Sequence, residues 1–461
     1  MAYTKYNNYK ECGIPMLESI PEHWLESEIR NAFDKNDNKN ENLEENNLLT
    51  LSYGIIKRKS INTTGGLLPA SFESYQILNK GMIVLRMLDL QNDKKSLRVG
   101  YVNEKGIITS AYIGLKATKD SNTKYYYYLL HFMDLIKHFY NGGGGVRQSL
   151  GYTDFRREKI IIPTKSEQTT IADFLDYKLE KIARFVKKKK QLVSLLIEQK
   201  AVVINQTVTK GINPNAKLKP SGIEWLGHIP EHWQVRKLKT IIKNSSLGGN
   251  YDSSESDTGI PLMKMGNLGR GTIKLEKVEY INPMEEYEEK HILKKNDFLF
   301  NTRNSADLVG KVSLWKNELP FSLYNSNILK IEFKKGFINE YINYLFNSNA
   351  LLNLLKLTSK GTTNVSAIYY KDLSLIKIWI PENVEEQKDI VNFLDTETSK
   401  IDKIISTLEK EIDLVVEYKT TLIAEAVTGK IDVRDFEVPE IEEPLAMLAE
   451  EASNYNKANQ Q

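Results

Sequence analysis

The chain has 461 residues, more than one hydrophobic core usually supports, so at least two domains are expected. Its composition is that of an ordinary globular protein, and a net charge of only +3 leaves binding to nucleic acid open. The sequence has no apolar run long enough for a membrane span, no signal-peptide core at its start and one cysteine, Cys12, so we expect a cytoplasmic protein without a disulfide.

The first predicted element is a short opening segment, residues 1–24, which ends in the letters Ile-Pro-Glu-His-Trp. The same five letters return at 229–233, and eight of the twelve positions in 13–24 are identical in 222–233. The period of about 210 residues is too long for a solenoid, whose units usually have roughly 20–50 residues. The repeat therefore indicates a duplicated domain, and two such halves tend to pack with pseudo-twofold symmetry.

Residues 25–163 predict a first globular domain in which short strands precede one helix near 123–140. A glycine-rich loop at 142–147 follows that helix, and the domain closes on an aliphatic strand that ends at Pro163. Tyr125–Tyr128 would suit base stacking, but apolar residues continue the same helix, so we interpret these tyrosines as helix core and rim. The histidine and tryptophan of each repeated opening motif are interpreted as structural residues rather than catalytic ones.

Residues 164–212 predict a first long helix, and 382–431 predict a second copy of it. Apolar positions recur every three or four residues in both, which is typical of a coiled-coil seam. The seam positions are Leu175, Leu179, Ile182, Val186, Lys189, Val193, Leu196, Lys200 and Val203 in the first helix, and Thr398, Ile401, Ile405, Leu408, Ile412, Val415, Lys419, Leu422 and Ala426 in the second. Gly211 and Gly429 are natural stops, and we expect the two helices to pack antiparallel.

A linker with the repeated opening motif, 213–233, leads into a second globular domain at 234–381. This domain has the layout of the first, with one helix near 337–356 and then a loop at 360–365, but little of its sequence. Residues 432–461 form a C-terminal tail that we expect to be poorly ordered from 437 onward.

Both globular regions are rich in polar side chains that suit base edges, since Arg pairs with guanine and Asn or Gln with adenine in the major groove. The candidates for DNA contact are Lys57, Arg58, Arg86, Arg147, Gln148 and Tyr152 in the first region, and Lys264, Asn267, Arg270, Asn301, Arg303, Asn304, Thr362, Thr363, Asn364 and Ser366 in the second. A solvated surface role is the simpler interpretation of any single one. The clusters 301–304 and 361–366 are stronger, because short polar side chains on tight loops pack poorly.

Several catalytic signatures are absent from the sequence: the phosphate-binding loop, the His-Glu-x-x-His zinc motif, and the Asn-Pro-Pro or Asp-Pro-Pro motif of an adenine methyltransferase. No Pro-Asp pair of the commonest nuclease signature occurs, and one cysteine and six histidines show no metal-ligand spacing. We therefore predict no catalytic residue, no metal site and no cofactor in this chain.

The repeated Pro-Glu-His-Trp motifs, the repeated Glu-Gln-x-x-Ile-x-x-Phe-Leu-Asp helices and the two dissimilar globular regions resemble the specificity subunits of Type I restriction-modification systems. The likeness covers residues 13–431 and is most specific in the helix motif and in the segment 361–381. It implies an α+β fold, in which two mixed α/β target recognition domains are separated by two long helices packed as an antiparallel coiled coil, in a pseudo-twofold tandem repeat.

By this resemblance, each domain reads one half of a bipartite site on double-stranded DNA. The helices set the spacer and dock two methylation subunits, which carry S-adenosylmethionine, and motor-nuclease restriction subunits join for restriction. The first domain departs from the pattern, because its counterpart of the Thr362–Asn364 loop is all glycine, so Arg147 and Gln148 are its expected substitutes. Two alternatives stay open: a coiled-coil scaffold with two protein-binding heads, and a solitary nuclease, which the missing motifs disfavour.

Overall fold

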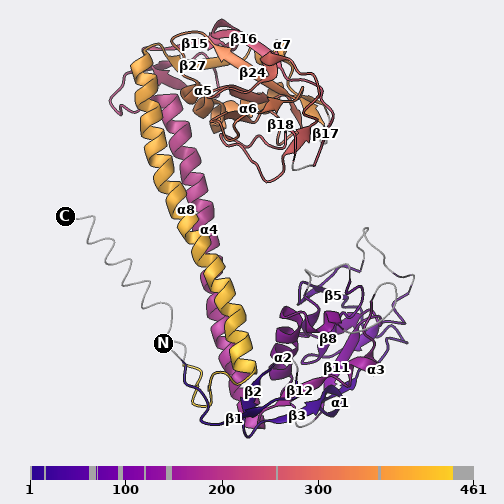
Figure 1. Ribbon diagram of the computed structural model, residues 1–461. Coiled ribbons are helices and arrows are strands. Elements are labelled where there is room, and N and C mark those ends of the chain that lie inside the picture. The colour runs from indigo at the N-terminus through magenta and orange to yellow at the C-terminus, as the bar shows by residue number, and fades with distance from the viewer. Residues whose placement is uncertain are drawn as a thin grey trace, which may run out of the picture. The chain divides into compact units, whose positions relative to one another are not determined.

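The computed structural model describes residues 3–14, 17–61, 69, 71–91, 97–118, 121–141, 148–255, 258–361 and 365–439. The chain divides into two compact units (Figure 1), one of residues 1–189 with 410–461 and one of residues 190–409. Each unit holds one globular domain together with parts of both long helices, α4 (Lys165–Lys210) and α8 (Val384–Val427). In the part of the chain that the structure describes, no helix is both long and apolar enough to cross a membrane.

The first domain begins and ends on one pair of strands, because β3 (Leu25–Glu28) pairs antiparallel with β12 (Lys159–Ile162). Its central sheet has the order β4-β11-β8-β9 and is antiparallel throughout. The remaining elements complete the unit: β1 (Tyr9–Glu11), β2 (Ser19–Pro21), α1 (Ile29–Ala32), β4 (Phe33–Lys35), β5 (Leu49–Ser52), β6 (Ile55–Arg58), β7 (Gln76–Leu78), β8 (Ile83–Leu85), β9 (Val99–Tyr101), β10 (Gly106–Ile108), β11 (Ile113–Ala117), α2 (Thr123–Leu135), η1 (His138–Asn141) and α3 (Tyr152–Phe155).

The second domain repeats this plan: β15 (Trp233–Lys237) pairs with β27 (Lys377–Pro381), and the central sheet has the order β16-β24-β20-β22. Only β18 and β23 pair in parallel among the described strands, so the fold class is α+β, as predicted. The other elements of the second unit are β13 (Leu218–Pro220), β14 (His228–Pro230), η2 (Leu238–Thr240), β16 (Ile242–Leu247), β17 (Ser253–Ser254), β18 (Ile260–Met263), β19 (Glu279–Ile281), η3 (Glu289–His291), β20 (Phe298–Asn301), β21 (Arg303–Asn304), β22 (Val312–Leu314), β23 (Leu323–Tyr324), β24 (Ile328–Phe333), α5 (Asn339–Phe346), α6 (Asn349–Thr358), β25 (Lys360–Gly361), β26 (Ser366–Ala367) and α7 (Tyr370–Leu373).

Two predictions about helices in the globular domains have different outcomes. The single helix expected near 337–356 is wrong, because α5 ends at Phe346 and Ser348 starts α6 by accepting the N–H of Leu351. The four tyrosines are helix core and rim as interpreted, since Tyr125, Tyr126 and Tyr128 on α2 are buried and Tyr127 is half-buried.

The predicted seam of the long helices is confirmed within each unit. Between residues 182 and 200 of α4, the half-buried positions are the seam positions alone, and the α8 seam positions are likewise buried or half-buried. In the first unit Lys189 Nζ lies 2.8 Å from the Glu411 carboxylate, and in the second Lys200 Nζ lies 2.7 Å from Asp402. As the residue number along α4 rises from 189 to 200, the number of the paired residue on α8 falls from 411 to 402, so the two helices are antiparallel.

Candidate nucleic-acid interface

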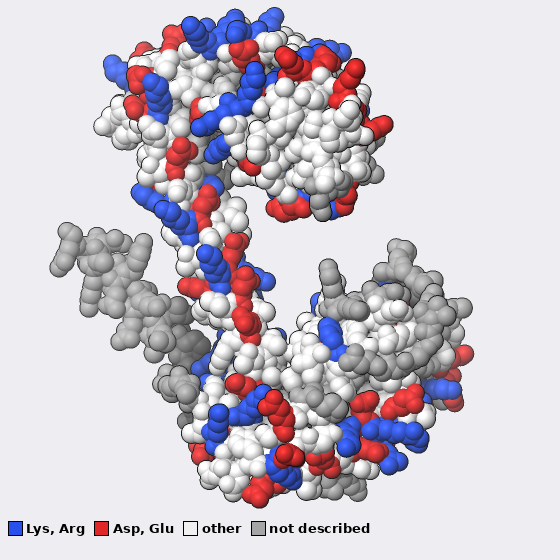
Figure 2. Space-filling view, in the orientation of Figure 1, with Lys and Arg blue, Asp and Glu red and all other residues white. Residues whose placement is uncertain are grey.

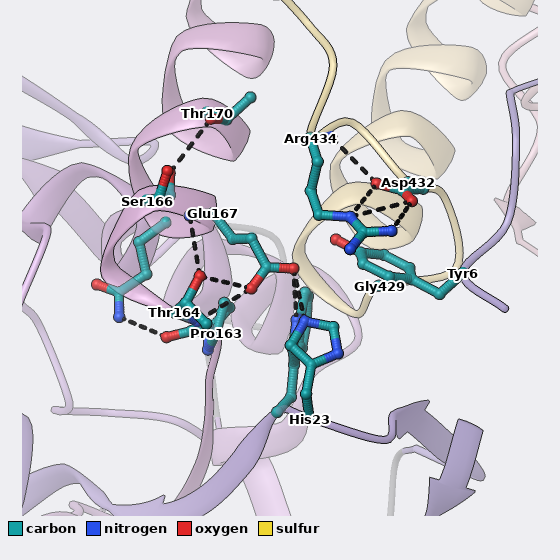
Figure 3. Close-up of polar contacts among 12 residues, drawn as sticks. Tyr6, His23, Pro163, Thr164, Ser166, Glu167, Thr170, Gly429, Asp432 and Arg434 are labelled. Carbon is teal, nitrogen blue, oxygen red and sulfur yellow. Dashed lines mark hydrogen bonds and ion pairs between the residues drawn. The ribbon is translucent and has the colours of Figure 1, made fainter. Parts of the chain in front are cut away.

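The repeated opening motif meets the start of the long helix at a buried carboxylate, Glu167 (Figure 3). Its Oε1 accepts hydrogen bonds from His23 Nε2 at 2.9 Å and from Trp24 Nε1 at 3.2 Å, while Oε2 accepts from the Thr164 hydroxyl at 2.7 Å. Burial disfavours the charged form, but the bonds from Thr164, His23 and Trp24 outweigh it and lower the pKa of Glu167.

The second unit builds the same junction around Glu386. Its carboxylate accepts His232 Nε2 at 2.8 Å and Trp233 Nε1 at 2.8 Å, and both tryptophans of the repeat are completely buried. The neighbouring glutamines also match: Gln168 donates to the carbonyl of Pro163 at 3.0 Å, and Gln387 donates to that of Pro381 at 2.9 Å. The residues that the two halves share therefore join each domain to its helix, and these histidines and tryptophans have a structural role at the junction.

In the first domain, the loop after β8 meets the segment before α3. Leu150 donates its N–H to the Met87 carbonyl at 3.0 Å, and Leu90 donates to the Gln148 carbonyl at 3.1 Å. Arg86 and Gln148, two candidates that lie 62 positions apart in the sequence, are thus brought to one place on the domain.

The corresponding segments of the second domain meet in a small sheet of order β21-β26-β25. Arg303 pairs with Ala367 and Asn304 pairs with Ser366, so the two clusters that the sequence favoured lie on adjacent strands. A hollow of about 300 Å³ opens beside this sheet, and we call it the apolar hollow. Its lining consists of Leu247, Thr302, Arg303, Ser326, Asn327, Leu329, Ala367, Ile368, Tyr369 and Tyr370.

A second hollow of about 630 Å³ shares Asn327 with the first. It holds the candidates Lys264 and Asn267, and it adds two further lysines, Lys274 and Lys277. Three glutamates, Glu255, Glu276 and Glu279, line the same hollow and balance the three lysines, and Lys264 is paired with Glu279. The two hollows together form the candidate interface of the second domain.

A buried cation stands at the same place in the two domains, immediately before β9 and before β22. Arg98 is completely buried, and its guanidinium donates to the carbonyls of Leu88 at 2.7 Å and Asp89 at 3.2 Å, in the loop after β8. Lys311 is 9% exposed and donates to the Met265 carbonyl at 3.4 Å, at the edge of the second hollow. Sequence reasoning missed both, since a buried cation has no local signature.

Three candidates do not fit a role in base contact, because their side chains are buried. Asn301 is 0% exposed: it faces the same side of β20 as Leu299, which lies in a buried cluster with Trp315. Asn267 is 5% exposed and closes its own loop, accepting the Lys264 N–H at 2.8 Å and donating to the loop carbonyls. Ser366 is 4% exposed within β26.

Other candidates are accessible but engaged in the protein. Arg58 pairs with Glu104, and Arg270 donates to the Asp307 carbonyl at 3.0 Å. Gln148 donates to the Tyr140 carbonyl at 2.9 Å, and Asn304 accepts the Ser305 N–H at 2.9 Å.

Arg303 differs from these candidates, because its exposed guanidinium has no hydrogen bond or ion pair within the described ranges. Lys57 is exposed on β6, while Arg86 and Tyr152 are half-buried. Arg147, Thr362, Thr363 and Asn364 lie outside the described residues, as does the chain from 440 onward. Base contact by any candidate stays a prediction.

On the face that Figure 2 shows, charge does not mark out one region of either unit. Figure 2 shows acidic and basic side chains interspersed over the described surface in view, without a broad field of one sign. In the stretches that the structure describes, no group of three or more His, Cys, Asp or Glu side chains is placed to hold a metal ion. Local groups such as Arg303, rather than bulk charge, distinguish the candidate interface.

The duplicated fold and its paired junctions define a protein with two related α+β domains in tandem. One family description, the Type I restriction modification DNA specificity domain, matches residues 7–194 and again 230–414. The two matches span both globular domains and most of the chain. The chain therefore belongs to the Type I restriction-modification DNA specificity family, as the sequence resemblance predicted.

Individual relatives agree with this assignment. The MjaVIII specificity subunit of a type I restriction enzyme from Methanocaldococcus jannaschii is 27% identical over 345 residues, 73% of this chain and 76% of that one. The EcoKI specificity subunit of Escherichia coli K12 is 25% identical over 280 residues, 59% of this chain but only 57% of its own length. A solved chain from a study of complex assembly in the type I R-M system covers 89% of this chain and 99% of its own, with a TM-score of 0.64 at 13% identity, and supports the fold alone.

Proposed function

We propose that this chain is the DNA-reading subunit of a Type I restriction-modification complex, and that each globular domain reads one half of a bipartite duplex target. The observation that supports this most is that the specificity-domain match occurs twice, once over each domain. The meeting of two polar loop segments on each domain gives each half its own surface for base readout.

In this proposal the chain is cytoplasmic and has no catalytic activity of its own. Two methylation subunits carry S-adenosylmethionine and dock on the long helices, and motor-nuclease subunits join for restriction. Apolar side chains exposed on the helices are suited to such docking: Leu192, Leu195 and Ile197 on α4 are 42%, 61% and 56% exposed. The helices would also set the spacer between the half-sites.

The experiment is a genome-wide methylation map of cells that express this chain together with its methylation partner. We expect one motif, made of two short half-sites separated by a fixed number of unread base pairs. Cells with the partner alone serve as the control and should lack the motif. A motif that persists without this chain, or a complex that shows no sequence preference, would overturn the proposal.

A second measurement tests whether the chain itself is non-catalytic, independently of whether it reads DNA. Titration calorimetry of the purified chain with S-adenosylmethionine should give no binding heat, and the chain alone should neither methylate nor cleave duplex DNA. Stoichiometric binding of the cofactor to the chain alone would contradict its non-catalytic role.

A further inference from the structure

The apolar hollow beside β21 is lined by buried apolar side chains together with the polar side chains of Thr302, Ser326 and Asn327. The buried apolar residues are Leu329, Ala367 and Ile368, which are 4%, 8% and 1% exposed. Hydrogen bonds fix the shape of the hollow, because Ile368 donates its N–H to the Thr302 carbonyl at 2.9 Å and Thr302 donates its own N–H to the Asn327 carbonyl at 2.9 Å.

The rim of the apolar hollow exposes large side chains to solvent. Leu247 and Tyr369 are each 50% exposed, and Tyr370 is 43% exposed. Exposed apolar side chains gathered around one hollow are a candidate surface for a ligand or partner. Arg303 also lines the hollow, with its guanidinium unpaired among the described residues.

Duplex DNA offers few groups that match an apolar hollow. The base edges in the major groove are hydrogen-bond donors and acceptors, and the one apolar group among the four ordinary bases is the 5-methyl of thymine. Arg suits the acceptor pair of guanine in the same groove. A surface that sets Arg303 beside an apolar hollow therefore complements a guanine next to a thymine.

We infer that the apolar hollow receives the 5-methyl group of a thymine in the half-site read by the second domain, beside the base pair that Arg303 contacts. This inference rests on the proposed function and assigns part of the specificity to Leu247, Ile368 and Tyr370, which the sequence did not single out. It requires the second half-site to contain a thymine.

The test uses the assembled complex and duplexes that carry the mapped motif, with each thymine of the second half-site replaced in turn by deoxyuridine. Deoxyuridine keeps the polar groups of thymine and lacks only the methyl. At one position, binding should weaken about three- to tenfold, as expected for loss of one buried methyl group with a partly unfilled cavity.

Two matched variants locate the effect. Leu247→Asn should abolish the penalty for deoxyuridine at that position, whereas Leu357→Asn should keep it, since Leu357 is 82% exposed on α6 and does not line the hollow. Coupling between the variant and the methyl group is what identifies a contact.

Several outcomes would overturn the inference while the proposed function stands. These are a second half-site without thymine, deoxyuridine duplexes that bind as well as thymine duplexes, and a penalty that survives in Leu247→Asn. A Leu247→Asn variant that loses its methylation partner instead would assign the hollow to a protein contact. Loss of all sequence preference by the wild-type complex would refute the proposed function itself.

Discussion

Glu167 shows how one buried residue connects the repeated sequence to the fold. A buried carboxylate is destabilising unless donors surround it, and here His23, Trp24 and Thr164 supply them. Because its folded-state pKa lies below the ordinary value of 4.5, ionisation of Glu167 stabilises the fold above that pH. This stabilisation is lost as the pH falls through the folded-state pKa.

Glu167→Gln should therefore lower the free energy of unfolding by about 1–3 kcal/mol at neutral pH, since the lost hydrogen bonds involve a charged acceptor. The difference from wild type should narrow as the pH falls below 4.5. Thermal unfolding of both proteins between neutral and acidic pH measures it. Glu22→Gln is the control, because Glu22 is exposed in the same motif, and a gap that does not change with pH would contradict the assignment.

Arg303 is the residue on which base readout by the second domain can be tested most directly. Arg303→Ala should weaken specific binding by about 1–3 kcal/mol and relax the preference at one base pair of the second half-site. Competition binding of the assembled complex with the mapped motif measures both. Arg236→Ala is the control, since Arg236 pairs with Glu382 on the strand pair that closes the domain. Unchanged affinity and preference in Arg303→Ala would remove this residue from the interface.

At the scale of elements, the ends of the long helices depend on glycines in the left-handed conformation. Gly211 has φ 75° and Gly429 has φ 72°, which confirms both predicted stops. Their surroundings differ: a Cβ on Gly429 would lie 2.5 Å from the Pro21 ring and 3.0 Å from Trp24, whereas on Gly211 the nearest atom, of Trp233, is 3.5 Å away.

Gly211→Ala should cost about 1–2 kcal/mol of stability, the usual penalty of a left-handed residue with a side chain. Gly429→Ala should cost about 2–5 kcal/mol, because overpacking against a rigid proline ring adds to that penalty. Thermal unfolding of the two variants side by side tests the difference. Equal losses of stability would mean that the opening motif moves readily to make room for the Cβ added at residue 429.

At the scale of the whole molecule, the helices are proposed to set the spacer. Four residues inserted into α4 between Lys190 and Val193, with four inserted into α8 between Glu409 and Ile412, lie next to the boundary between the two units, which falls after Lys189 and after Glu409. Each insertion adds about 6 Å of helix, and four residues disturb a heptad seam only locally.

The spacer of the methylated motif should then grow by one or two base pairs, at about 3.4 Å per pair, while both half-sites stay the same. A methylation map of the insertion variant is the measurement. An active variant with an unchanged spacer would show that the helices do not set it, and altered half-sites would show that base readout extends beyond the globular domains.

The sequence by itself determined the duplication, the seam of the long helices and their glycine stops. Each of these is a local pattern: repeated letters, spacings of three and four, or a single residue type that favours positive φ. The spacing of three and four residues along α4 predicts its half-buried positions, Val186, Lys189, Val193 and Leu196. The prediction succeeds because helix geometry alone decides which side chains face the partner helix.

Only the tertiary structure decided which polar residues are available to DNA. Asn301 and Arg303 are two positions apart in one favoured cluster, yet the first is buried and the second exposed, because the central sheet packs against a hydrophobic cluster while β21 joins a small sheet with β26. Tyr370 lines the same apolar hollow as Arg303, although it belongs to a segment far away in the sequence. Such pairings depend on hydrogen bonds between distant strands, and no local periodicity of the chain encodes them.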